Sequence, residues 1–118
     1  MLVQNKTYKQ AIMTTLADEE MMKVVNAVIL CSKSINDIIR ETGISHTTAY
    51  RKVKWMLENG LLTVEKINIT KDGKRSSLLR SVFKSIKVSY EFEKISVEVE
   101  QNINVLHKIA EKMFSLDA

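Results

Sequence analysis

The apolar residues of this chain repeat with two different periods, and the period changes at Gly60. Before Gly60 they recur every three or four residues, which places side chains on one face of a helix. After Gly60 they alternate with polar residues, as in strands that bury one face. The chain has no proline and only three glycines, which leaves few sharp loops. The pattern therefore predicts an α+β protein whose helices precede its strands.

Capping signals divide the N-terminal half into four predicted helices. Asp18, Ser34 and Ser45 each precede a helical run, and each can accept a hydrogen bond from a free amide of the first turn. Gly43 and Gly60 follow such runs and can take the left-handed conformation that ends a helix. We therefore expect helices over 4–16, 18–31, 34–43 and 45–59.

The C-terminal half is predicted to contain three extended segments and one helix. The first segment begins near Leu62 and ends at a turn that contains Asp72-Gly73, a strong hairpin signal. The second covers about 77–91 and the third 95–100, with a short turn at Glu93-Lys94 between them. Helical spacing returns over 102–116.

The net charge of +4 is unevenly distributed along the chain. Residues 1–44 carry five basic and five acidic groups, residues 45–90 carry ten and three, and residues 91–118 carry three and six. The net charges of the three segments are therefore 0, +7 and −3. A cationic middle segment suits a polyanionic partner, although a solvated lysine-rich surface would give the same count.

Two stretches resemble a known family of regulators. Residues 34–54, which read SINDIIRETGISHTTAYRKVK, resemble the helix-turn-helix of ArsR-type regulators, and residues 16–28 resemble the first core helix of that family. Residues 58–62 are similar to the junction between its recognition helix and its wing. The tail of the chain is similar to that of archaeal members.

The resemblance implies an α+β winged helix-turn-helix fold. This fold would combine a three-helix core and a β-hairpin wing with an extra strand and a C-terminal dimerisation helix. We predict an N-terminal helical arm over 1–16, a DNA-binding domain over 17–91, and the extra strand and last helix over 92–118. The implied function is a transcription regulator that binds double-stranded DNA as a homodimer.

The third core helix of this fold would read DNA in the major groove. Ala49, Val53 and Met56 are spaced to face the core, and residues 45–57 contain no acid. Guanidinium, hydroxyl and aromatic side chains on the opposite face can contact base edges, thymine methyl groups and phosphates. The predicted DNA-binding residues of this helix are Ser45, His46, Thr47, Thr48, Tyr50, Arg51, Lys52 and Lys54.

The predicted hairpin tip adds three cations at one turn, namely Lys71, Lys74 and Arg75. A tip of this composition suits the phosphate backbone or the adjacent minor groove. A charged turn that only keeps the hairpin soluble is the alternative.

The apolar face of the last helix is predicted to form the dimer, as terminal helices do in ArsR-like proteins. Its predicted dimerisation residues are Ile103, Leu106, Ile109, Ala110, Met113 and Leu116. A dimer would place two recognition helices one DNA turn apart.

The sequence gives little indication of an enzyme or of a metal-binding protein. Cys31, His46 and His107 do not form a metal-ligand set, and Cys31 is expected in the core. We expect no cofactor, no metal, no membrane partner and no catalytic residues, and the sequence indicates no effector. The single cysteine fits the reducing cytoplasm. Two alternatives stay open: a winged-helix module that binds protein, and an architectural protein that binds DNA without sequence preference.

Overall fold

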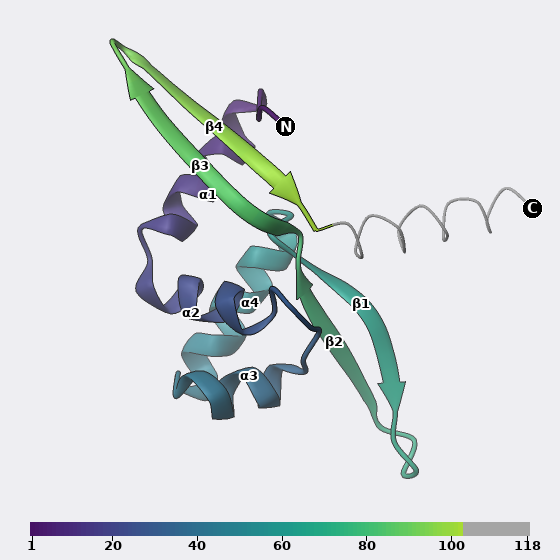
Figure 1. Cartoon of the computed structure of the whole chain (residues 1–118). Helices are drawn as coiled ribbons and strands as arrows, with labels where there is room; N and C mark the ends of the chain where they lie inside the picture. Colours follow the sequence, from purple (N-terminus) through teal and green to yellow (C-terminus); the bar gives the residue numbers. More distant parts are fainter. Residues whose placement is uncertain (103–118) are drawn as a thin grey trace, which may run out of the picture.

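The computed structural model describes residues 1–102 of the 118-residue chain (Figure 1). Within this range the chain forms four helices and then four strands. The helices are α1 (Lys6–Leu16), α2 (Glu19–Ala27), α3 (Ile35–Thr42) and α4 (His46–Glu58). The strands are β1 (Leu62–Ile69), β2 (Arg75–Ser81), β3 (Phe83–Glu91) and β4 (Lys94–Gln101).

The predicted capping residues begin and end the helices. The side chains of Asp18, Ser34 and Ser45 accept hydrogen bonds from the backbone amides three residues further on. Gly43 ends α3 with a φ of 75°, in the left-handed region. The predicted starts of α2, α3 and α4 are therefore confirmed, because each depends on a hydrogen bond that forms within one helical turn.

The core lies between the helices and the proximal ends of the strands. Ile12 of α1, Val24 of α2, Ile38 of α3 and Met56 of α4 are fully buried. Leu61, Leu62, Leu79, Phe83 and Val97 complete the same cluster from the strands and from the residue that precedes them. All four helices therefore contribute to one core, α1 included.

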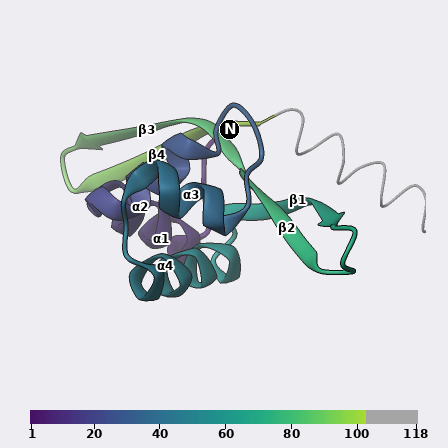
Figure 2. The ribbon, with the colours of Figure 1, turned by 90° about the horizontal axis from the view of Figure 1, so that it is seen from below.

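The strands form two separate antiparallel hairpins. β1 pairs with β2 around the turn at Gly73, and β3 pairs with β4 around Phe92 and Glu93. The chain leaves the first hairpin at Val82, whose amide donates to the carbonyl of Leu61 at 3.2 Å. The two hairpins extend from the helices toward opposite ends of the molecule, as Figures 1 and 2 both show.

The predicted winged helix-turn-helix fold class is wrong. The structure has four helices before the strands, followed by two separate hairpins, and not a three-helix core with a wing. The first reason is that α1 buries Ala11, Ile12 and Thr15 in the core. The second is that the extended segment predicted over 77–91 is interrupted at Val82, so β3 takes a new partner. The predicted C-terminal dimerisation helix lies outside the described residues.

No helix within residues 1–102 is both long enough and apolar enough to cross a membrane.

Candidate nucleic-acid interface

Helix α4 has one buried face and one exposed face. Ala49, Val53 and Met56 are buried in the core, as their spacing predicts. The exposed side carries residues of the predicted set, and these are His46, Thr47, Tyr50, Arg51 and Lys54. Ser45 caps the helix by accepting a hydrogen bond from the Thr48 amide at 3.4 Å. The exposed face thus presents a cluster of donors and two cations.

Two aromatic side chains lie together on this face. The rings of His46 and Tyr50 are stacked, with centroids 6.4 Å apart and an angle of 15° between their planes. Tyr50 remains 51% exposed. A flat, partly exposed ring pair next to Arg51 provides both an apolar surface and hydrogen-bonding groups for a base edge.

Lys52 is directed away from the exposed face of α4. Its Nζ lies 2.6 Å from Oδ2 of Asp18 and 3.1 Å from Oε1 of Glu20. The hydrogen bond with Asp18 is the main cause that raises the pKa of Lys52, and the same contact lowers the pKa of Asp18. Lys52 therefore joins α4 to the start of α2, and the structure separates it from the other predicted DNA-binding residues.

The three predicted cations of the β1–β2 hairpin lie exposed at its tip. Lys71 and Lys74 belong to the turn itself, and Arg75 begins β2. The turn is closed by hydrogen bonds from the amide of Thr70 to the carbonyl of Lys74, and from the amide of Gly73 to the carbonyl of Thr70, both at 2.9 Å. Gly73 has a φ of 80°, which favours glycine at this position.

A groove of about 410 Å³ connects α4 to the β1–β2 hairpin. Its polar lining comes from three elements and includes Ser34, Asn36, Tyr50, Lys54, Arg75 and Ser76. Val53, Leu57 and Leu79 supply the apolar part of the lining, and Glu58 adds one carboxylate. The structure thus brings Lys54 and Arg75, which are 21 positions apart in the sequence, to one surface depression.

Sequence reasoning missed Ser34, Asn36 and Ser76 as groove residues. The sequence identifies Ser34 only as a helix cap, and capping does not reveal that the start of α3 adjoins β2. The close approach is fixed by backbone hydrogen bonds between Lys33 and Leu79, at 3.0 and 2.8 Å. These bonds join segments that no local pattern connects.

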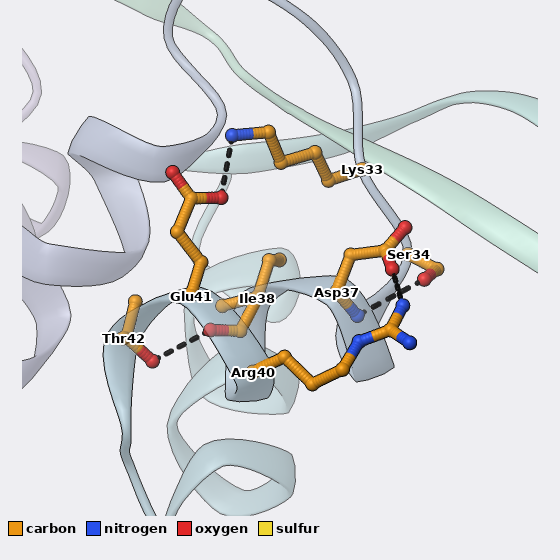
Figure 3. A network of polar contacts seen from close by, with 7 residues as sticks. All are labelled: Lys33, Ser34, Asp37, Ile38, Arg40, Glu41 and Thr42. Carbon is orange, nitrogen blue, oxygen red and sulfur yellow. Dashed lines mark hydrogen bonds and ion pairs between the residues drawn. The ribbon is translucent and has the colours of Figure 1, made fainter.

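Outside α4 and the hairpin tip, four cationic side chains of the described residues form ion pairs with neighbouring acids, namely Lys33, Arg40, Arg80 and Lys84. On α3, Arg40 contacts Asp37, and Lys33 lies 2.6 Å from Glu41 (Figure 3). Arg80 is buried against Glu65 at 3.2 Å. By contrast, within residues 1–102 no ion pair forms at Arg51, Lys54, Lys71, Lys74 or Arg75. The exposed face of α4 and the hairpin tip together thus present five cations without an ion pair, although lysines elsewhere in the described residues, such as Lys6 and Lys23, form none either.

Other predicted residues lie elsewhere. Cys31 is exposed, so its predicted place in the core is wrong; α2 ends at Ala27, before the chain reaches Cys31. Among residues 1–102 no three His, Cys, Asp or Glu side chains are grouped so that they could hold a metal ion. The predicted dimerisation residues lie outside the described part of the chain, as does His107.

Comparisons with known proteins return no matching family model, no matching curated protein and no matching solved structure.

Proposed function

We propose that this chain is a sequence-specific transcription regulator that binds double-stranded DNA as a homodimer. Helix α4 enters the major groove, and the β1–β2 hairpin lies on the backbone or in the adjacent minor groove. The observation that carries the proposal is that exposed cations of α4 and of the hairpin, Lys54 and Arg75 among them, lie at one groove and form no ion pair in the described structure.

Helix α4 has the size and chemistry that base recognition requires. A helix fits the major groove, and side chains near its N-terminal end meet base edges. Arg51 lies in the N-terminal half of α4 and is exposed, so its guanidinium can donate two hydrogen bonds to a guanine. Thr47 and the stacked Tyr50 ring present methyl and ring carbons to thymine methyl groups.

The groove and the hairpin have the chemistry of phosphate contacts. Lys54 and Arg75 lie at the groove together with the hydroxyls of Ser34 and Ser76. The N-terminal end of α3 also faces this region, and free amides at a helix start favour anions. We therefore assign the groove to a backbone segment of the strand that flanks α4.

Selection of binding sites from random duplexes tests the proposal directly. The expected result is an enriched sequence with two related half-sites about one helical turn apart. Affinity should fall steeply with salt, because each neutralised phosphate releases condensed counterions. Failure to enrich any sequence, or to bind any duplex at low salt, would refute the proposal. Tight binding to all duplexes without enrichment of any sequence would indicate an architectural protein instead.

Two substitutions separate base contacts from phosphate contacts. Arg51→Ala should cost about 1–3 kcal/mol on the selected site and relax the preference at one base pair. Lys74→Ala should weaken binding to every duplex alike and reduce the salt slope by about one per half-site. Lys6→Ala is the matched control, because Lys6 is also an exposed cation but lies on α1, outside the groove and the hairpin tip; the DNA affinity of this variant should stay unchanged.

A further inference from the structure

Within residues 1–102, strand β3 has one edge that pairs with no other strand. β4 is bonded to β3 on one side, and on its other side it meets residues 1–3, where Val3 donates to the carbonyl of Val97 at 2.8 Å. Within residues 1–102, the backbone groups of residues 84–91 form hydrogen bonds with β4 alone. An edge of this length is a template for a further strand.

The distal part of the same hairpin exposes apolar side chains. Val88 is opposite the buried Val97, and Tyr90 is opposite Ile95, so these four side chains share one face of the hairpin. Along each strand their exposure rises toward the tip, from 0% at Val97 to 38% at Ile95 on β4 and from 41% at Val88 to 75% at Tyr90 on β3. Phe92 at the turn is 85% exposed. This face is the uncovered continuation of the core, and uncovered faces of this kind mark interaction sites.

The charges on the opposite face show which strand complements the β3 edge. Along β3, Lys87 and Glu91 lie symmetrically about Ser89. We propose that β3 pairs antiparallel with β3 of a second copy, with a two-fold axis at Ser89. Each Lys87 then lies opposite the partner's Glu91. Because Lys87 is already opposite Glu98, and Glu91 opposite Lys94, one row across four strands reads Glu98, Lys87, the partner's Glu91 and the partner's Lys94.

The registers centred on Lys87 and on Val88 lack this complementarity. Directly opposed residues of two paired strands point to the same face of the sheet. When each strand shifts by one residue, the two-fold axis therefore moves from Ser89 to an adjacent residue. An axis at Lys87 opposes two lysines, which is unfavourable. An axis at Val88 places Lys87 opposite Ser89 and leaves both charges without a partner. The axis at Ser89 pairs both charges and also places Val88 beside the partner's Tyr90.

The second copy would not block the candidate nucleic-acid interface. The tip of the β3–β4 hairpin and the tip of the β1–β2 hairpin lie at opposite ends of the molecule (Figure 1). The pairing extends the homodimer of the proposed function, but it concerns a surface that DNA does not use. Its test is made without DNA: a dimer that is insensitive to the charge reversals would refute the pairing alone, whereas a chain that binds no duplex would refute the proposed function alone.

Charge reversal followed by mixing tests the pairing in the full chain. Sedimentation velocity of the wild type should show a reversible dimer, expected in the micromolar range because the contact is small. Lys87→Glu and Glu91→Lys should each raise the dimer Kd at least about tenfold, since each replaces two attractive pairs with two repulsive ones. An equimolar mixture of these two variants should recover the dimer, because a heterodimer restores opposite charges at both positions.

Matched controls separate effects on the contact between the two β3 strands from effects on the hairpin itself. Lys94→Glu and Glu98→Lys make the same charge changes one strand further from the axis and disturb the same neighbours within one chain. They should leave the dimer Kd within about threefold of the wild type. Three outcomes would each overturn the proposal: a monomeric wild type at all concentrations, a dimer that is insensitive to both reversals, and reversed variants that do not associate when mixed.

Discussion

Asp18 makes two separable contacts at the start of α2, and its replacement tests how α4 is held in place. Its Oδ1 accepts a hydrogen bond from the Met21 amide at 2.9 Å, and its Oδ2 lies 2.6 Å from Nζ of Lys52. Asp18→Ala removes both contacts. Asp18→Asn keeps an acceptor for the amide and removes the charge, so the pair of variants measures the helix cap and the ion pair separately.

The expected losses of stability follow from these two contacts. Loss of a capping side chain costs about 1 kcal/mol. The ion pair is partly exposed, and Glu20 stays 3.1 Å from Lys52, so the loss of the Asp18 charge costs only about 0.5 kcal/mol. We expect a loss of about 1.5 kcal/mol for Asp18→Ala and about 0.5 kcal/mol for Asp18→Asn, measured by urea unfolding at neutral pH. Glu19→Gln is the matched control and should change stability by less than about 0.3 kcal/mol.

The pH dependence of stability tests the contribution of the Asp18 charge. The hydrogen bond from Lys52, and then that from the Met21 amide, lower the pKa of Asp18 below its ordinary value of 3.8. A depressed folded-state pKa stabilises the fold above the unfolded-state pKa, and this contribution is lost as pH falls through the folded-state value. The difference between wild type and Asp18→Asn should therefore be constant between about pH 5 and pH 9 and should shrink below about pH 4.

Two results would refute this reasoning. Equal losses for Asp18→Ala and Asp18→Asn would show that the cap contributes nothing. A difference between wild type and Asp18→Asn that persists undiminished at about pH 2 would show that the ion pair is not its cause.

Three further predictions concern other contacts of the fold. Burial raises the pKa of Tyr8 to about 12, and its hydroxyl donates a hydrogen bond to the carbonyl of Gly60 at 2.8 Å. Tyr8→Phe should lower the free energy of unfolding at neutral pH by about 1 kcal/mol. It should also remove part of the decrease in stability that the wild type shows between about pH 10 and pH 12, which unfolding at alkaline pH would measure. Glu93 has a φ of 62°, so Glu93→Gly should raise stability by about 0.5–1 kcal/mol in thermal unfolding. The side chains of Arg80 and Glu65 form a buried ion pair and are 8% and 9% exposed. Arg80→Met leaves the charge of Glu65 buried, so it should lower the free energy of unfolding in urea by about 3 kcal/mol. The double variant Arg80→Met, Glu65→Leu should lose less stability than Arg80→Met alone.

Local signals in the sequence predicted the elements whose ends are fixed locally. Asp18, Ser34 and Ser45 begin helices, and Gly43 ends one, because each acts through hydrogen bonds within a single turn or through its own backbone freedom. The turn at Asp72-Gly73 was predictable for the same reason. The exposed face of α4 followed from helical spacing, since the buried positions alone determine which side chains remain outside.

Features fixed by distant partners could not be predicted from the sequence. Regular alternation over 77–91 begins only at Val82, with Phe83 out of phase, but this does not reveal that β2 ends at Ser81, because the break depends on hydrogen bonds to the carbonyls of Leu61 and Val28. Lys52 could be placed on α4 but not paired, because its partner Asp18 lies 34 positions away. The groove likewise depends on the approach of α3 to β2, so only tertiary structure reveals it.

The total charge of residues 45–90 overstates the charge that this region offers to DNA. Lys52, Arg80 and Lys84 contribute to the net charge of +7, but each lies within 4 Å of a carboxylate of the same chain. Their positive charge is largely compensated at short range and contributes little to the field around the molecule. Arg51 and Lys54 on α4 and the cations of the β1–β2 tip form no such pairs in the described structure, so their charge is not compensated at short range. Binding should therefore depend strongly on a few side chains at the groove and weakly on the other lysines, a contrast that a uniformly basic surface would not produce.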